Sequence, residues 1–218
     1  MGKKYKFLAF DFGASSGRAM LATFDGEKIT LEEKRRFSND PVNINGDLHW
    51  DVLRLFFEIK QGILKCANSG DRDIDCIGID TWGVDYGLLD ENDKLIGNPY
   101  HYRDTRTEGM YDEAFKLVPK EEIFKETGIA FNWFNTIYQL LSAKLSGDTS
   151  LKNAKTLLMM PDLFNFFLTG VKKTEYTNAS TTQMYNSEKY EWSYDLLKKL
   201  GIPTDILTDV IFPGEIVG

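Results

Sequence analysis

The residues best suited to chemistry lie first in the segment from Asp11 to Arg18, which reads Asp-Phe-Gly-Ala-Ser-Ser-Gly-Arg. Backbone amides between small residues can close around an anion, and two hydroxyls and a guanidinium add hydrogen-bond donors around it. These donors come from Gly13, Ala14, Ser15, Ser16, Gly17 and Arg18. Asp11 supplies carboxylate oxygens, which Mg²⁺ prefers, directly or through water. The segment therefore predicts a phosphate-binding loop with a metal ligand at its start.

Two better-known phosphate motifs do not match this loop. The GxxxxGK[ST] spacing of the Walker A loop fails, and the GxGxxG pattern of dinucleotide-binding folds is absent. A polar hairpin, in which glycine supplies positive φ and Asp11 caps its own turn, explains the same residues without a ligand. The residue types alone leave both interpretations open.

A second polar segment, Thr81 to Asp85, directly follows an apolar run and has residue types suited to a sugar. Trp82 offers a flat apolar wall, Thr81 and Asp85 can bind hydroxyls, and Gly83 lets the backbone approach a ligand closely. A Trp-Gly pair after a buried strand is also typical of core packing and a bend. Sugar binding and core packing are therefore alternative interpretations of this segment.

Tyr102 and Arg103 form a third candidate group, because an aromatic ring and a guanidinium close to a carboxylate suit a sugar site. An ordinary surface ion pair between Arg103 and Asp104 explains these residues equally well. We keep Tyr102 and Arg103 as predicted substrate contacts.

The apolar pattern predicts a sheet that holds these segments. Strands are expected at 6–10, 19–24, 29–37, 76–80 and 86–89, the last two as buried strands. Asp25-Gly26 is a strong hairpin signal, so the first three strands should be consecutive and antiparallel. Between Asp51 and Asn68 apolar residues recur at three- and four-residue spacing, which predicts an amphipathic helix that Gly70 stops. A strand, a helix and a strand form a crossover, so the sheet should be mixed.

Beyond Thr107 the chain is predicted to be helical, because proline and glycine recur at positions typical of helix starts and ends. Helices are expected from Pro119 to Gly128, from about Thr136 to Gly147, from Pro161 to Gly170, and over Tyr194 to Leu200 before Gly201. We expect one α/β domain over residues 1–218, with the mixed sheet in about 1–107 and a helical subregion in about 108–218.

The amino-acid composition excludes several classes of function. The 218 residues carry a formal net charge of −7, with two histidines and two cysteines. An acidic chain has no excess of cations for broad nucleic-acid binding, and Lys34-Arg35-Arg36 is interpreted as a solvated strand end. So few histidines disfavour a multi-histidine metal centre, and Cys66 and Cys76 are expected to be buried free thiols. No apolar run is long enough for a membrane span or a signal peptide, which predicts a cytoplasmic protein.

Read in order, the acidic strand end, the small-residue hairpin, two further strands, a helix and a strand resemble the opening of the actin-like ATPases, which have a ribonuclease H-like fold. The resemblance is closer to the FGGY family of sugar kinases, whose first loop has Asp-x-Gly followed by hydroxyl residues and an Arg. This resemblance implies that residues 13–18 bind the phosphates of ATP and that Asp11 assists Mg²⁺. It also implies that Thr81–Asp85, Tyr102 and Arg103 face the sugar.

The run Asp80 to Asp85, Asp-Thr-Trp-Gly-Val-Asp, is most similar to the branch of that family that phosphorylates the 1-hydroxyl of L-rhamnulose. Segments 160–162, 175–183 and 212–218 are also similar to that branch, so the resemblance covers essentially the whole chain. L-Rhamnulose and ATP are therefore the expected ligands. Another FGGY sugar or polyol kinase is the alternative within the enzyme class, and a non-catalytic actin-like binding module is the alternative from another class.

No catalytic residue is assigned within this chain. The resemblance implies that the proton-accepting Asp lies in a later motif, beyond Gly218, where the second lobe and its adenosine site begin. Asp80 and Asp85 are weaker candidates for the base, because binding of sugar hydroxyls explains them. We expect these 218 residues to be an N-terminal kinase lobe that partners its own C-terminal lobe, binds substrate weakly and does not turn over alone.

Overall fold

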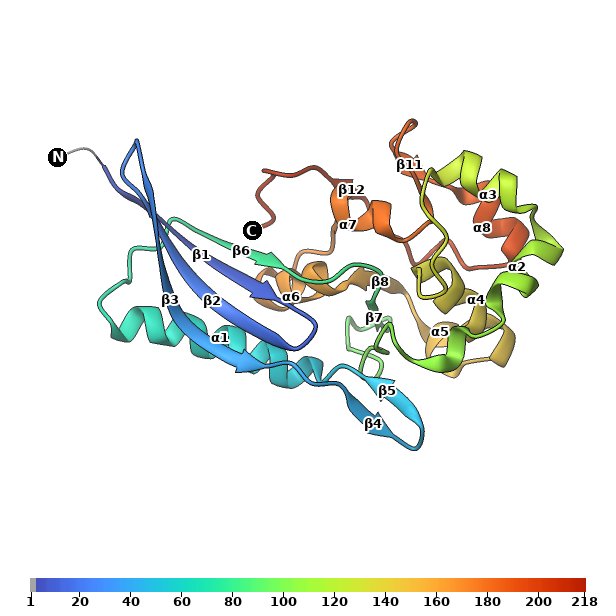
Figure 1. Cartoon of the computed structure of the whole chain (residues 1–218), viewed down its shortest axis with the longest axis horizontal. Helices are drawn as coiled ribbons and strands as arrows, with labels where there is room; N and C mark the ends of the chain where they lie inside the picture. The colour runs from blue at the N-terminus through green and yellow to red at the C-terminus, as the bar shows by residue number, and fades with distance from the viewer. Residues whose placement is uncertain (1–2) are drawn as a thin grey trace. The chain divides into compact units, whose positions relative to one another are not determined.

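The computed structural model describes residues 3–218 (Figure 1). The chain divides into two compact units. The first unit comprises the described residues up to Pro41 together with Asp51–Trp82, and the second comprises Val42–Trp50 and Gly83–Gly218. The boundary between the units thus falls between Trp82 and Gly83, inside a predicted site segment. The division near residue 107 stays a prediction.

The first unit is built on a four-stranded mixed sheet with the order β3-β2-β1-β6. Its strands are β1 Tyr5–Phe12, β2 Ser16–Phe24, β3 Ile29–Ser38 and β6 Cys76–Asp80. Strands β1, β2 and β3 are antiparallel neighbours, and β6 runs parallel to β1. The predicted three-stranded opening and the crossover to a parallel strand are both confirmed.

Helix α1, Val52–Asn68, makes this crossover and packs on β2 and β3. It begins where predicted, because the Asp51 side chain accepts a hydrogen bond from Arg54 N–H at 3.1 Å and so caps the helix. Gly62 permits the close approach, since a Cβ there would lie 2.6 Å from the Phe10 ring. The sequence pattern therefore locates both the helix and its contact face.

Strand β6 differs from the prediction of a buried strand. Ile77 is 37% exposed, and Cys76 is exposed while Cys66 is buried. The cause is position, because β6 lies at the edge of the sheet and, among the described residues, pairs with β1 alone. The prediction of two free thiols is confirmed, but the expectation that Cys76 is buried was wrong.

The second unit is mainly helical around its own hydrophobic core. Its helices are η1 Thr105–Thr107, α2 Met110–Leu117, α3 Lys120–Thr127, α4 Thr136–Ser146, α5 Thr149–Asn153, α6 Met160–Thr169, α7 Tyr176–Thr181 and α8 Tyr194–Leu200. Its strands form pairs: β4 Val42–Ile44 with β5 Asp47–His49, β7 Tyr86–Leu89 with β8 Thr156–Met159, β9 Thr174–Glu175 with β12 Val210–Ile211, and β10 Tyr185–Asn186 with β11 Glu191–Trp192. Strand β7 is thus a buried strand, as predicted, but it pairs antiparallel with β8 in a sheet of its own.

Glycine ends the helices of this unit as the sequence predicts. Gly128, Gly147, Gly170 and Gly201 each follow a helix in the left-handed conformation that needs no side chain. Pro119 is the N-cap of α3 and so precedes the first helical residue. Among the described residues no helix has the length and apolar character that a membrane span requires.

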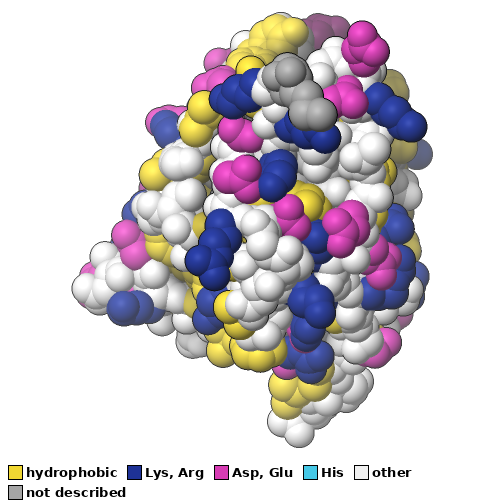
Figure 2. All heavy atoms as spheres, turned by 90° about the vertical axis from the view of Figure 1, so that its left-hand side faces the viewer, with side chains coloured by type: hydrophobic (Ala, Val, Ile, Leu, Met, Phe, Trp, Pro, Cys, Tyr) yellow, Lys and Arg dark blue, Asp and Glu magenta, His cyan; other side chains and the backbone are white. Residues whose placement is uncertain are grey.

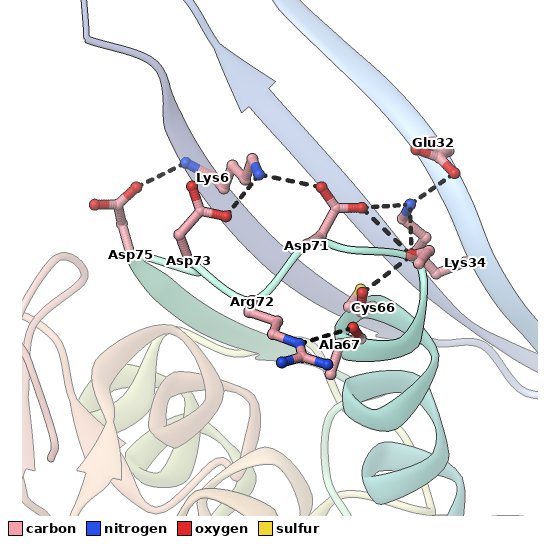
Figure 3. A network of polar contacts seen from close by, with 10 residues as sticks. Lys6, Glu32, Lys34, Cys66, Ala67, Asp71, Arg72, Asp73 and Asp75 are labelled. Atoms are coloured by element: carbon pink, nitrogen blue, oxygen red, sulfur yellow. Dashed lines mark hydrogen bonds and ion pairs between the residues drawn. The ribbon is translucent and has the colours of Figure 1, made fainter.

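The basic run at residues 34–36 is paired with carboxylates inside the first unit. The Lys34 ammonium contacts Asp71 at 2.9 Å and Glu32 at 2.7 Å, and its side chain is only 4% exposed (Figure 3). Arg35 pairs with the buried Glu58 at 2.5 Å. The prediction of a solvated strand end was therefore wrong for Lys34, because β3 directs this side chain toward the loop after α1. On the face seen in Figure 2, cationic and acidic side chains are interspersed.

Asp71 is central to this network, since it also contacts the Lys6 ammonium of β1 at 3.1 Å (Figure 3). We expect Asp71→Asn to lower the melting temperature by several degrees, because it leaves the buried Lys34 ammonium with the exposed Glu32 as its carboxylate partner. Asp73→Asn is the matched control: Asp73 contacts Lys6 but is 78% exposed, so its loss should change little. Equal melting temperatures of the two variants in thermal unfolding would contradict this account.

Candidate functional site: a glycine-serine loop and a strained strand end

The loop between β1 and β2 is a tight turn closed by a hydrogen bond from Gly13 N–H to Ser16 C=O at 2.9 Å. Within residues 3–218, the N–H groups of Ala14 and Ser15 have no hydrogen-bond acceptor. Unpaired N–H groups at the tip of a turn can bind an anion. The backbone of this loop therefore fits a phosphate group.

Asn39, which the sequence reasoning missed, holds the loop in shape. Its side-chain amide donates to Gly13 C=O at 2.7 Å, and its N–H donates to Ser15 C=O at 3.0 Å. Asn39 is 3% exposed, so these bonds are sheltered from water. The only sequence signal was its place just after β3, whose last residue, Ser38, pairs with Ser16.

Two predicted ligand-binding residues contact each other. Asp11 and Arg18 are register partners on β1 and β2, and the Arg18 guanidinium lies 2.7–2.8 Å from Asp11 Oδ2. Both side chains are more than 40% exposed, so both are accessible to a nucleotide or a cation. Gly17 has a packing role, because a Cβ there would lie 2.3 Å from the Phe37 ring. Its small size is thus explained without a ligand.

The parallel pairing of β1 and β6 brings a second segment to the same end of the sheet. Asp11 and Asp80 are register partners at the carboxyl ends of these strands, and Thr81 follows directly. Thr81 and Trp82 are half-buried, and the Thr81 hydroxyl donates to Trp82 C=O at 2.9 Å. Within the first unit, the predicted phosphate-binding loop and the start of the predicted sugar segment therefore share one edge.

Gly83 and Asp85 belong to the second unit, where they flank a tight turn. Asp85 N–H donates to Gly83 C=O at 2.9 Å, and Val84 between them has a φ of +67°. The Cβ position of Gly83 is occupied, since a Cβ there would lie 2.9 Å from Thr181 Oγ1. Close packing is therefore one reason for glycine at this position.

Asp85 is fully buried, and its carboxylate gathers three donors from the protein. Oδ2 accepts from Trp50 Nε1 at 2.6 Å and from Tyr102 N–H at 3.0 Å, while Oδ1 accepts from Gln139 Nε2 at 2.9 Å. Burial raises the pKa of Asp85 to about 7, although the bonds from Trp50, Gln139 and Tyr102 lower it. A direct contact between Asp85 and a sugar hydroxyl stays a prediction, but the observed contacts position Tyr102.

An aromatic stack that the sequence did not reveal supports Tyr102. The Trp50 and His101 rings stack at 4.0 Å between centroids, and His101 stacks on Tyr102 at 4.5 Å. Burial lowers the pKa of His101 to about 4, so the ring is neutral near pH 7. The exposed Arg103 lies with its guanidinium carbon 5.3 Å from the centre of the Tyr102 ring. The structure therefore brings Tyr102 and Arg103 together.

The alternative of a surface ion pair between Arg103 and Asp104 is wrong. Asp104 is buried, and its carboxylate accepts from Leu48 N–H at 2.7 Å and from Arg106 N–H at 2.9 Å. Asp104 thereby caps η1 and attaches it to β5. The guanidinium of Arg103 is left at the surface beside Tyr102.

Comparison with known proteins assigns the family. Residues 6–218 match the N-terminal domain of the FGGY family of carbohydrate kinases. The chain belongs to this family. Curated FGGY relatives include rhamnulokinases of Oceanobacillus iheyensis, 43% identical over 97% of this chain, and of Mannheimia succiniciproducens, 46% identical over 96%. The chain spans 45% and 44% of the length of these relatives, so it corresponds to less than half of each.

Solved structures of a gluconate kinase and of a xylulose kinase share the fold. A gluconate kinase from Lactobacillus acidophilus superposes with a TM-score of 0.87 at 19% identity, covering 99% of this chain and 44% of that one. A ligand-bound xylulose kinase from the same organism superposes with a TM-score of 0.86 at 20% identity, covering 98% and 43%. The predicted actin-like α/β fold with a mixed sheet is confirmed.

The raised pKa of Asp85 predicts how the stability of the fold depends on pH. The native state holds this proton more tightly than the unfolded chain, so the stabilising contribution is complete below about pH 4 and is lost as the pH rises through about 7. Asp85→Asn cannot ionise. The free energy of unfolding of the wild type minus that of the variant should therefore fall between pH 4 and 8.

Urea unfolding at several pH values measures this difference. Asp162, whose pKa burial raises to about 8, and His101 titrate in both proteins and cancel in the subtraction. A difference that stays constant or grows with pH would show that Asp85 is not protonated more readily in the folded state.

Proposed function

We propose that this chain is the N-terminal lobe of an ATP-dependent kinase that phosphorylates the 1-hydroxyl of L-rhamnulose. The observation that carries the proposal is the 43–46% identity to rhamnulokinases over nearly the whole chain. The loop with free N–H groups and the half-buried strand end beside it support the same function, since phosphoryl transfer depends on holding the phosphates and aligning the hydroxyl.

In this proposal each segment has a separate task. The N–H groups of Ala14 and Ser15, the hydroxyls of Ser15 and Ser16, and the Arg18 guanidinium bind phosphate oxygens of ATP, and Asp11 holds Mg²⁺ directly or through water. Mg²⁺ held there would neutralise charge that develops on the transferred phosphoryl group. Among residues 3–218 no group of three or more His, Cys, Asp or Glu side chains is arranged as a metal site, so phosphate and water would complete the ligand set.

The proposed sugar contacts are Thr81 and Trp82 in the first unit and, in the second unit, the backbone of Gly83 together with Tyr102 and Arg103. A flat indole and hydroxyl partners suit the apolar and polar faces of a sugar. The proton-accepting carboxylate and the adenosine site would come from the C-terminal lobe of the full-length protein. Such an enzyme would act in the cytoplasm, where ATP is available.

A coupled assay of ADP release tests the proposal on the full-length protein. L-Rhamnulose should give the highest kcat/KM in a panel that includes D-xylulose, L-fuculose, gluconate and glycerol. The present 218 residues alone should show no turnover. A higher kcat/KM with another sugar would make that sugar the substrate in place of L-rhamnulose. If the full-length protein bound sugars but turned over none of them, a non-catalytic module would be favoured.

The phosphate loop makes a separate prediction. Arg18→Ala in the full-length protein should raise the KM for ATP by roughly tenfold or more, because it removes a charged donor, and should leave the KM for the sugar unchanged. Arg36→Ala is a matched control, since Arg36 is the neighbour of Arg18 on β3 but pairs with Glu33. An unchanged KM for ATP in Arg18→Ala would remove Arg18 from the nucleotide site.

A further inference from the structure

The turn at Gly83–Asp85 has a strained backbone. Val84 adopts a φ of +67°, in the left-handed region that β-branched residues rarely occupy. With the hydrogen bond from Asp85 N–H to Gly83 C=O, the three residues form a γ-turn whose central φ is positive, which is a rare and strained turn. Such a conformation persists only where neighbouring groups hold it, and it is typical of functional sites.

Two threonine hydroxyls hold Val84 from its two sides. Thr181 Oγ1 accepts a hydrogen bond from Val84 N–H at 3.2 Å, and Thr136 Oγ1 donates to Val84 C=O at 2.6 Å. Gln139 Nε2 adds a longer bond to the same carbonyl oxygen at 3.3 Å. Thr181 is the last residue of α7 and Thr136 the first of α4, so two helix ends clamp one peptide unit on each side of Val84.

Thr181 is also held in one orientation. Its hydroxyl donates to Asn178 C=O at 2.8 Å, so its hydrogen points back along α7 and its lone pairs are left for Val84 N–H. Helix α7 is itself capped, because Glu175 Oε2 accepts from Thr177 N–H at 2.9 Å and from Asn178 N–H at 3.2 Å. The acceptor that the turn needs therefore sits at the end of an anchored helix.

The clamp determines what the chain presents at Gly83. Thr181 packs where a side chain of Gly83 would be, with its Cβ and Cγ2 each 3.1 Å from that position. Gly83 is half-buried, while Val84 is 8% exposed and Asp85 is fully buried. Gly83 is thus the last residue of the segment whose backbone is open to a ligand, and its peptide orientation is set by the turn.

We propose that Thr181 and Thr136 are positioning residues for sugar binding. They do not touch the sugar; they hold Val84 in its left-handed conformation, which fixes the direction of the Gly83 peptide and keeps Asp85 at its buried donors. This inference rests on the proposed function, in which the segment Thr81–Gly83 contacts the sugar. The inference adds to the site the hydroxyls of Thr181 and Thr136, which lie outside that segment.

Kinetics of the full-length protein with L-rhamnulose and ATP test the clamp. Thr181→Val keeps the shape of the side chain and removes the acceptor, and Thr136→Val removes the donor. Each should raise the KM for the sugar by roughly tenfold, the factor expected for one lost hydrogen bond, with the KM for ATP unchanged. Thr181→Ser and Thr136→Ser retain the hydroxyl and should bring the sugar KM back to within about twofold of the wild type.

Ser180→Ala is the matched control on the same helix, because among the described residues the Ser180 hydroxyl bonds only to Thr177 C=O, at 2.7 Å. It should leave both KM values unchanged. Wild-type sugar KM in Thr181→Val, an equal rise of both KM values, or no recovery in the Ser variants would overturn the positioning role. If Thr181→Val does not fold, the comparison of Thr136→Val with Thr136→Ser decides whether the positioning role holds. Absence of sugar turnover by the wild type would instead overturn the proposed function, and the positioning role with it.

Discussion

The buried carboxylate of Asp85 is the constraint on which the candidate residues of the second unit depend. A carboxylate without access to water is costly unless donors surround it. The donors here come from three segments that are distant in sequence: the indole of Trp50, the backbone of Tyr102 and the amide of Gln139. Satisfying one carboxylate therefore joins the end of β5, the segment before η1 and the first turn of α4. The place of Tyr102 follows from that junction.

The first unit holds its own candidate residues by different means. Its phosphate loop needs no buried charge, because the β1–β2 register sets its ends and Asn39 bonds to two of its carbonyl groups. Parallel pairing of β6 with β1 then brings Thr81 to the same edge of the sheet. A short sheet edge thus carries both the predicted phosphate-binding groups and the start of the predicted sugar segment.

Local features of the fold were predictable from the sequence. Hairpin signals, helical periodicity and glycines after helices depend on neighbouring residues, so the first three strands, α1 and four helix ends were located correctly. Features that depend on distant contacts were not predictable. Lys34 is buried because its ammonium pairs with the carboxylate of Asp71, which lies 37 residues away in the sequence. Ile77 is exposed because β6 lies at a sheet edge.

The site was predictable to the same extent. The loop at 11–18 and the run at 80–85 combine suitable residue types over a few positions, so they could be named as candidates. The groups that shape them could not: Trp50 and Asn39 lie outside any motif, and Val84 looks like an ordinary apolar strand residue until its φ is known. Thr181 belongs to a polar run, and the sequence pattern of that run indicates no specific contact for this hydroxyl. Tertiary hydrogen bonds, which have no local signature, determine these roles.

A crystal structure of the full-length protein with L-rhamnulose and a non-hydrolysable ATP analogue tests the central claim most directly. The account predicts the ketose within hydrogen-bonding distance of the Gly83 backbone and beside the Tyr102 ring, with the phosphates on the N–H groups of Ala14 and Ser15. Val84 should keep its positive φ in that complex. A sugar bound away from Gly83 and Tyr102, or phosphates that do not contact the loop at 13–18, would contradict the account.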